Sequence, residues 1–132
     1  MRHVRLLVLA LAMVALVAQP AAAAEFSESA EVPGIITVSG ATLTLQAGPV
    51  KQEANIPPTT AGGTLTLTVS AQVEQPTFAH DVQGTCVIIK VTGLKAGAQL
   101  NASFKPADGG ETVKTPPVTV NRQPSAEATV CA

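Results

Sequence analysis

The side chains that could do acid–base or nucleophilic chemistry are few in this 132-residue chain, and they lie far apart in the sequence. One histidine, His80, remains after the first 24 residues, and Asp81 stands next to it. Neighbouring residues of a β-strand point to opposite faces, so these two side chains do not form a catalytic pair by themselves. The serines Ser70, Ser103 and Ser125 lack the glycine pattern of a nucleophile elbow. The sequence therefore predicts that this protein is not an enzyme.

The two cysteines, Cys86 and Cys131, are too far apart for a redox Cys-x-x-Cys motif. A zinc site needs three or four ligands, and the chain offers only these cysteines and His80. An exported protein meets an oxidising compartment, so we expect a structural disulfide and neither a metal nor a cofactor. Cys86 shares a strand face with Lys90, and Cys131 shares one with Glu127. We therefore expect the bridge outside the main core, between strands that are neighbours or meet at one rim.

Residues 1–24 have the pattern of a secretory signal peptide. A basic start leads into an unbroken apolar run at residues 6–17, and four alanines follow at residues 21–24. The run is short for a membrane span and ends in a small-residue cleavage site, although a retained membrane anchor is the alternative. We expect cleavage before Ala24 or Glu25, a single domain over residues 25–132, and a secreted protein that is extracellular or on the cell surface.

The composition after residue 24 argues against several classes of partner. This part keeps six of the eight Lys and Arg and all nine Asp and Glu, so its formal charge is −3. A mildly acidic domain suits neither nucleic acid nor an anionic membrane surface. Phe26, Phe78 and Phe104 are the only aromatic residues, whereas carbohydrate-binding and single-strand nucleic-acid folds use exposed aromatic platforms. We expect an unknown protein partner, no nucleic acid, and no membrane contact after cleavage.

The clearest structural signal is the strict alternation over residues 63–74. The apolar parity holds Leu65, Leu67, Val69, Ala71 and Val73, and the polar parity holds Thr64, Thr66, Thr68, Ser70, Gln72 and Glu74. Because side chains alternate between faces along a strand, this pattern predicts one long strand with an apolar face and a polar face.

Short apolar stretches separated by turn residues continue along the chain. Residues 85–92 are apolar on both faces, which indicates an interior strand. Three glutamates in residues 25–32 and Pro116-Pro117 in residues 113–120 indicate sheet edges. No helix is expected after residue 24, and the fold class is all-β, an antiparallel β-sandwich of about seven to nine strands. The expected strands are residues 25–32, 35–38, 42–47, 63–74, 77–82, 85–92, 98–105, 113–120 and 126–131.

The stretch from Lys90 to Leu100 resembles the corner before the penultimate strand of fibronectin type III and related immunoglobulin-like domains. In those domains a leucine is followed three residues later by a glycine and three residues after that by a tyrosine. Leu94 and Gly97 match, but Leu100 stands in place of the tyrosine, and the family's core tryptophan has no counterpart. The resemblance covers residues 86–120. It implies an immunoglobulin-like sandwich and no particular function.

Residues 48–63 form the longest interruption between the expected strands and contain three prolines. Proline cannot donate to a strand ladder, so this segment is expected to be a loop or an irregular edge. Long loops on rigid sheets often carry binding function, although a plain crossover between two sheets is the simpler interpretation. The candidate binding loop consists of Ala54, Asn55, Ile56, Pro57, Pro58, Thr59 and Thr60.

These features favour a secreted, non-catalytic β-sandwich that acts through protein contacts or as a surface or structural component. A secreted enzyme inhibitor that presents the proline-rich loop of residues 54–61 is the alternative, and a hydrolase or metal-binding enzyme ranks last. A rigid protruding loop would favour the inhibitor. A pocket that joins His80 to an acid and a hydroxyl would favour the enzyme, and an exposed apolar patch or open sheet edge would favour the contact protein.

Overall fold

The computed structural model describes residues 24–132, so the predicted signal peptide lies outside the described residues except for its last position. This part of the chain forms ten strands and a helix of one turn. The elements are β1 (Ala24–Val32), α2 (Gly34–Thr37), β2 (Ala41–Ala47), β3 (Val50–Ile56), β4 (Gly63–Gln72), β5 (Thr77–Gln83), β6 (Cys86–Thr92), β7 (Gln99–Pro106), β8 (Val113–Lys114), β9 (Val118–Thr119) and β10 (Ser125–Cys131).

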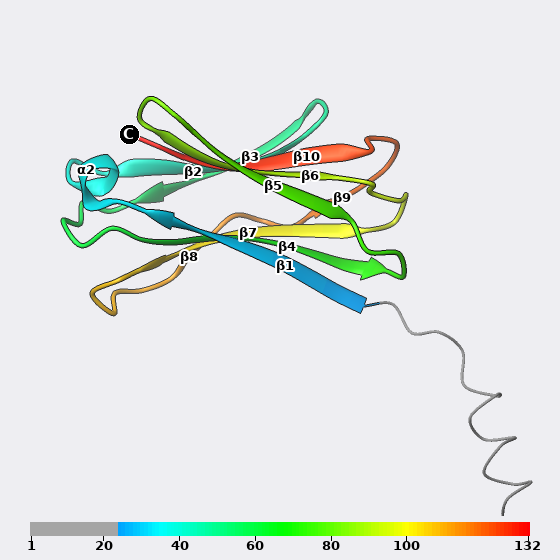
Figure 1. Cartoon of the computed structure of the whole chain (residues 1–132), viewed down its shortest axis with the longest axis horizontal. Helices are drawn as coiled ribbons and strands as arrows, with labels where there is room; N and C mark the ends of the chain where they lie inside the picture. Colours follow the sequence, from blue (N-terminus) through cyan, green and yellow to red (C-terminus); the bar gives the residue numbers. More distant parts are fainter. Residues whose placement is uncertain (1–23) are drawn as a thin grey trace, which may run out of the picture.

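The strands form two antiparallel sheets that pack face to face, so the all-β sandwich is confirmed. The first sheet has the order β1-β4-β7-β8, with β9 also pairing with β7, and the second has the order β3-β2-β10-β6-β5. Figure 1 shows the sheets as two layers, with α2 and the C-terminus at the same end of the sandwich. The resemblance to immunoglobulin-like domains has no support beyond this layered all-β architecture.

The strand predicted from the alternation of residues 63–74 is β4, which lies between β1 and β7. Its apolar side chains Leu65, Leu67 and Val69 are fully buried between the sheets, while the threonines between them are half-buried on the outer face. The largest fully buried side chains come from five strands and the turn after β9. They are Phe104, Leu43, Leu45, Leu65, Leu67, Ile89, Leu100, Val69, Val87, Val91, Val120 and Val130.

The predicted alternation is wrong at the end of β4. Ala71 has a φ of 59°, a left-handed conformation that is uncommon for any residue except glycine, and the pairing with β1 shifts register at this point. The irregularity exchanges the faces, so Gln72 is buried and Val73 is 58% exposed. The Gln72 Nε2 donates to the carbonyl oxygens of Glu74 (2.8 Å) and Gly93 (3.1 Å), and its Oε1 accepts the N–H of Lys95 (2.9 Å).

Two expectations for the segment between β1 and β4 are wrong. Residues 35–38 do not form a strand: α2 spans Gly34–Thr37, because Pro33 and Gly40 leave room for only one turn of chain. Residues 48–63 are not one loop, since residues 50–56 are β3, an edge strand that pairs with β2. With β3, and with the Pro116-Pro117 break separating β8 from β9, the strand count is ten rather than seven to nine.

Cys86 and Cys131 form the predicted disulfide, with their Cα atoms 4.2 Å apart. The two residues lie directly opposite each other on the neighbouring strands β6 and β10, and both point to the outer face of the sheet, as predicted. The strand β10 lies between β2 and β6. The C-terminal strand is therefore an interior strand that the ladder holds on both sides.

We expect the double variant Cys86→Ser/Cys131→Ser to lose about 2–4 kcal/mol of unfolding free energy, because the bridge closes a loop of 45 residues. Hydrogen exchange should rise in β10 together with β2 and β6, since β10 is paired on both sides. Exchange that rises in β10 alone would contradict this picture of an interior strand.

Candidate functional site

The candidate binding loop of residues 54–60 divides between a strand and a true loop. Ala54, Asn55 and Ile56 belong to β3 and pair with β2, and the Ile56 side chain is buried in the core. The chain lies outside the strands from residue 57 to residue 62, and we call residues 57–61 the proline loop. Pro57 and Pro58 are exposed at its start.

The proline loop is held against α2 by hydrogen bonds between Thr37 and Thr59. The Thr37 hydroxyl donates to the Thr59 carbonyl at 2.6 Å, and the Thr59 N–H donates to the Thr37 carbonyl at 2.9 Å. Thr37 is fully buried. A bond from a buried hydroxyl is shielded from competing water, so it fixes the loop at its centre.

Further contacts fix the second half of the proline loop. A side chain on Gly34 would collide with the Thr60 carbonyl oxygen, so glycine is required where α2 meets the loop. The Thr59 hydroxyl donates to Asp108 Oδ2 at 3.2 Å, and the Ala107 N–H donates to the Gly62 carbonyl at 3.0 Å. The loop is thereby tied to the turn after β7 as well as to α2.

Exposed apolar side chains accompany this rigid loop. Ile35 is 81% exposed and Val38 is 47% exposed, one in α2 and the other directly after it. We call the proline loop together with residues 34–38 the proline end. Two surface hollows adjoin it, and Pro57 and Pro58 line both. One, of about 400 Å³, extends over Asn55 and Ala132, and the other, of about 220 Å³, extends to the turn after β7.

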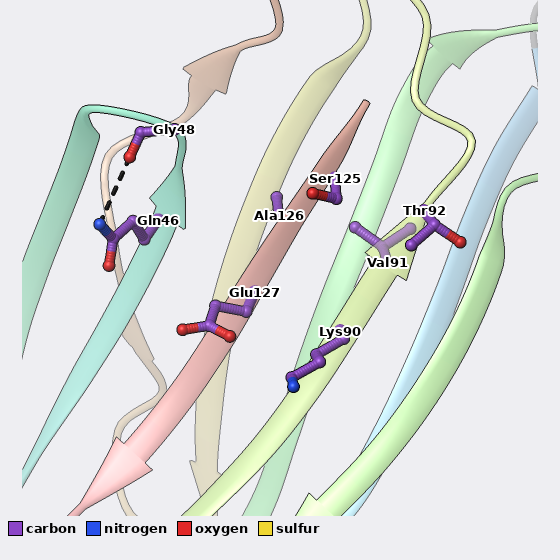
Figure 2. Close-up of a pocket in the computed structure, with 8 residues that line it drawn as sticks. All are labelled: Gln46, Gly48, Lys90, Val91, Thr92, Ser125, Ala126 and Glu127. Atoms are coloured by element: carbon purple, nitrogen blue, oxygen red, sulfur yellow. Dashed lines mark hydrogen bonds between the residues drawn. The ribbon is translucent and has the colours of Figure 1, made fainter. Parts of the chain in front are cut away.

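A third hollow, of about 440 Å³, lies on the outer face of the second sheet, over β2, β6 and β10 (Figure 2). Its charged side chains are Lys90 and Glu127, which stand opposite each other on neighbouring strands. Figure 2 shows the Gln46 amide turned to the Gly48 carbonyl, to which its Nε2 donates at 3.3 Å. Ser125 also lines this hollow, and none of the lining residues is a histidine.

His80 lies on β5 and lines none of these three hollows, although Glu28, which it contacts, lines a further hollow of about 400 Å³. Its Nε2 is 3.4 Å from the Glu28 Oε1 of β1, a contact that joins the two sheets at their open edge. Both side chains are about two-fifths exposed. Within residues 24–132, no three His, Cys, Asp or Glu side chains gather in a group suited to a metal ion.

The sequence pattern did not point to Thr37 or Ile35, because residues 35–38 were expected to form a strand. Only four residues lie between Pro33-Gly34 and Ser39-Gly40, which is short even for a strand. The close spacing of these two turn-forming pairs is the only local signal of a single helical turn. The partnership of Thr37 with Thr59 spans 22 residues, and no local pattern encodes it.

Comparison with known proteins finds no match to a protein family, to a curated protein or to a solved structure. Over residues 24–132, the chain contains no helix long and apolar enough to cross a membrane.

We expect Thr37→Val to lower the free energy of unfolding by about 1–2 kcal/mol, because it leaves the Thr59 carbonyl without its hydroxyl donor at nearly unchanged volume. Amide exchange in the proline loop should increase more than in the sheets. Thr60→Val, at an exposed position of the same loop, is the matched control and should leave both measurements unchanged. Equal effects of the two variants would show that the hydroxyl does not fix the loop.

Proposed function

We propose that this chain is an exported, non-catalytic binding protein whose proline end contacts a protein partner. The observation that carries the proposal is the 81% exposure of Ile35 on a segment that hydrogen bonds hold rigid. Burying an exposed isoleucine supplies binding free energy, and a rigid surface loses little conformational entropy on binding. The adjoining hollows over Pro57 and Pro58 offer space for side chains of the partner.

Hydrogen bonds hold the proline loop rigid, as expected of an enzyme inhibitor, but its backbone groups give that alternative less support. Inhibitors that mimic a substrate add a strand to the enzyme through free backbone groups. Pro57 and Pro58 have no N–H, and Thr59 uses its N–H and its carbonyl on Thr37. The Ala61 N–H bonds the Thr59 hydroxyl at 3.2 Å. Contact through side chains suits this loop better than strand addition.

Export is part of the same proposal. The apolar run of residues 6–17 and the alanines that follow support it, and the Cys86–Cys131 bridge is compatible with an oxidising compartment. The resemblance of the corner at Leu94 and Gly97 to immunoglobulin-like domains supports a common architecture only, and it adds nothing to the choice of partner.

The contact surface can be tested by capturing proteins from the culture medium and cell surface of the source organism. We expect the wild-type protein to retain a partner. The double variant Ile35→Ser/Val38→Ser should bind this partner with an affinity at least tenfold lower, and each tenfold corresponds to about 1.4 kcal/mol of binding free energy. Val73→Ser is the matched control, because Val73 is also exposed but lies beyond the far end of β4. A partner lost equally with the control variant would refute binding at the proline end.

Processing can be measured separately by intact-mass analysis of the exported protein. We expect a product that begins at Ala24 or Glu25, because the small-residue cleavage rule fits both positions. Leu9→Arg should block export by interrupting the apolar run. An exported product that still contains Met13 would rule out the signal peptide.

A further inference from the structure

The strand β5 forms the most exposed edge of the sandwich. It ends the order β3-β2-β10-β6-β5, so only one of its sides is paired. Six of its seven residues are exposed, and Val82 is 65% exposed although its side chain points to the inner face, opposite Val87. An unpaired edge of this kind offers backbone N–H and C=O groups to another strand.

The geometry of the disulfide pair shows which backbone N–H and C=O groups of β5 point to the unpaired side of this strand. A Cα separation of 4.2 Å marks Cys86 and Cys131 as a pair without mutual backbone hydrogen bonds, and the adjoining bond from the Ala132 N–H to the Thr85 carbonyl agrees. The backbone groups of Cys86 therefore turn to Gln83 on β5. Counting alternate residues from Gln83, the groups on the free side belong to Phe78, His80 and Val82.

One of these groups is already occupied. The Val82 N–H donates to the Asp81 Oδ1 at 2.8 Å, and the Gln83 Nε2 donates to the Asp81 Oδ2 at 2.8 Å. Asp81 thus caps one end of the free edge with its own carboxylate. Such a cap opposes pairing with another strand without preventing it, because the carboxylate is exposed and can turn to water.

Self-pairing about a two-fold axis at the middle of a strand brings its central residue opposite itself. The centre of β1 is Glu28 and the centre of β3 is Glu53, so self-pairing of either strand would place two carboxylates in contact. The centre of β5 is His80, which has no carboxylate, so self-pairing there creates no such contact. Among these three long edge strands, β5 alone is suited to a second copy of itself.

We propose that two copies of this chain pair through β5, antiparallel, about a two-fold axis at His80. In antiparallel pairing the numbers of paired residues add to a constant, so this register pairs His80 with His80 and Phe78 with Val82. The free-side backbone N–H and C=O groups of these three residues therefore all meet partners. Phe78 then faces Val82 of the second copy on the inner face. The exposed valine is covered, and the two five-stranded sheets become one continuous sheet.

Cysteine cross-linking tests the register. His80→Cys places two thiols on a hydrogen-bonded pair with Cα atoms about 5.5 Å apart, within disulfide range. Val82→Cys is the matched control, because its two copies would be about 14 Å apart along the strands. Under mild oxidation we expect a disulfide-linked dimer with His80→Cys and a monomer with Val82→Cys. Equal cross-linking of both variants, or of neither, would overturn the proposal.

Sedimentation provides a test without introduced cysteines. We expect wild-type protein to form a concentration-dependent dimer between about 10 μM and 1 mM, as suits a small interface. Asp81→Ala should lower the dimer Kd by about tenfold, because each copy then frees a Val82 N–H. Glu53→Ala makes the same charge change on β3 and should leave the Kd unchanged. A wild-type monomer throughout this range, or equal effects of the two variants, would contradict pairing at β5.

Discussion

Two apolar sheet faces must close over each other with almost no aromatic side chains, and the rest of the structure depends on this constraint. Phe104 is the only aromatic among the largest buried side chains of the described residues, and leucine, valine and isoleucine supply the others. Aliphatic side chains of this size reach native packing density only when every second residue of each inner strand faces the core. The strict alternation along β2, β7 and β10, and along β4 up to Ser70, meets this requirement.

Two of the three buried polar side chains among residues 24–132 lie where the alternation stops. Thr37 is buried at the proline end, and Gln72 is buried at the other end of β4. Each of them forms hydrogen bonds with backbone groups of a neighbouring loop. Thr37 bonds Thr59, and Gln72 bonds Gly93 and Lys95. A buried backbone group without a partner would destabilise the fold, so these side chains let the ends of a thin sandwich close without a larger core. Both ends are therefore tied by hydrogen bonds to a buried side chain.

The features that alternation encodes could be predicted from the sequence, and those that depend on contacts between distant residues could not. The apolar positions of β4 up to Val69 and the pairing of Cys86 with Cys131 follow from local pattern and compartment. The position of β3 could not be predicted, because the prolines before and after it are typical of a loop. The face change after Ala71 also escaped prediction, since Gln72 is buried only because partners 2 and 21 residues away satisfy its amide. Likewise, no local signal could place the candidate site, which depends on Thr37 meeting Thr59.

The outer faces of the sandwich limit where a partner can bind. On the first sheet the outer positions of β1, β4 and β7 are mainly hydroxyl, amide and charged side chains, and the Ser29 and Thr66 hydroxyls bond each other at 2.9 Å. Short hydroxyl side chains that already bond one another offer a partner little apolar area and few free donors. The large exposed apolar side chains Ile35, Val38, Val50, Val73 and Val82 lie instead at strand ends, turns and edges. Apolar burial drives most protein association, and the large exposed apolar side chains that could take part in it lie at the ends and edges of the sandwich rather than on its broad faces.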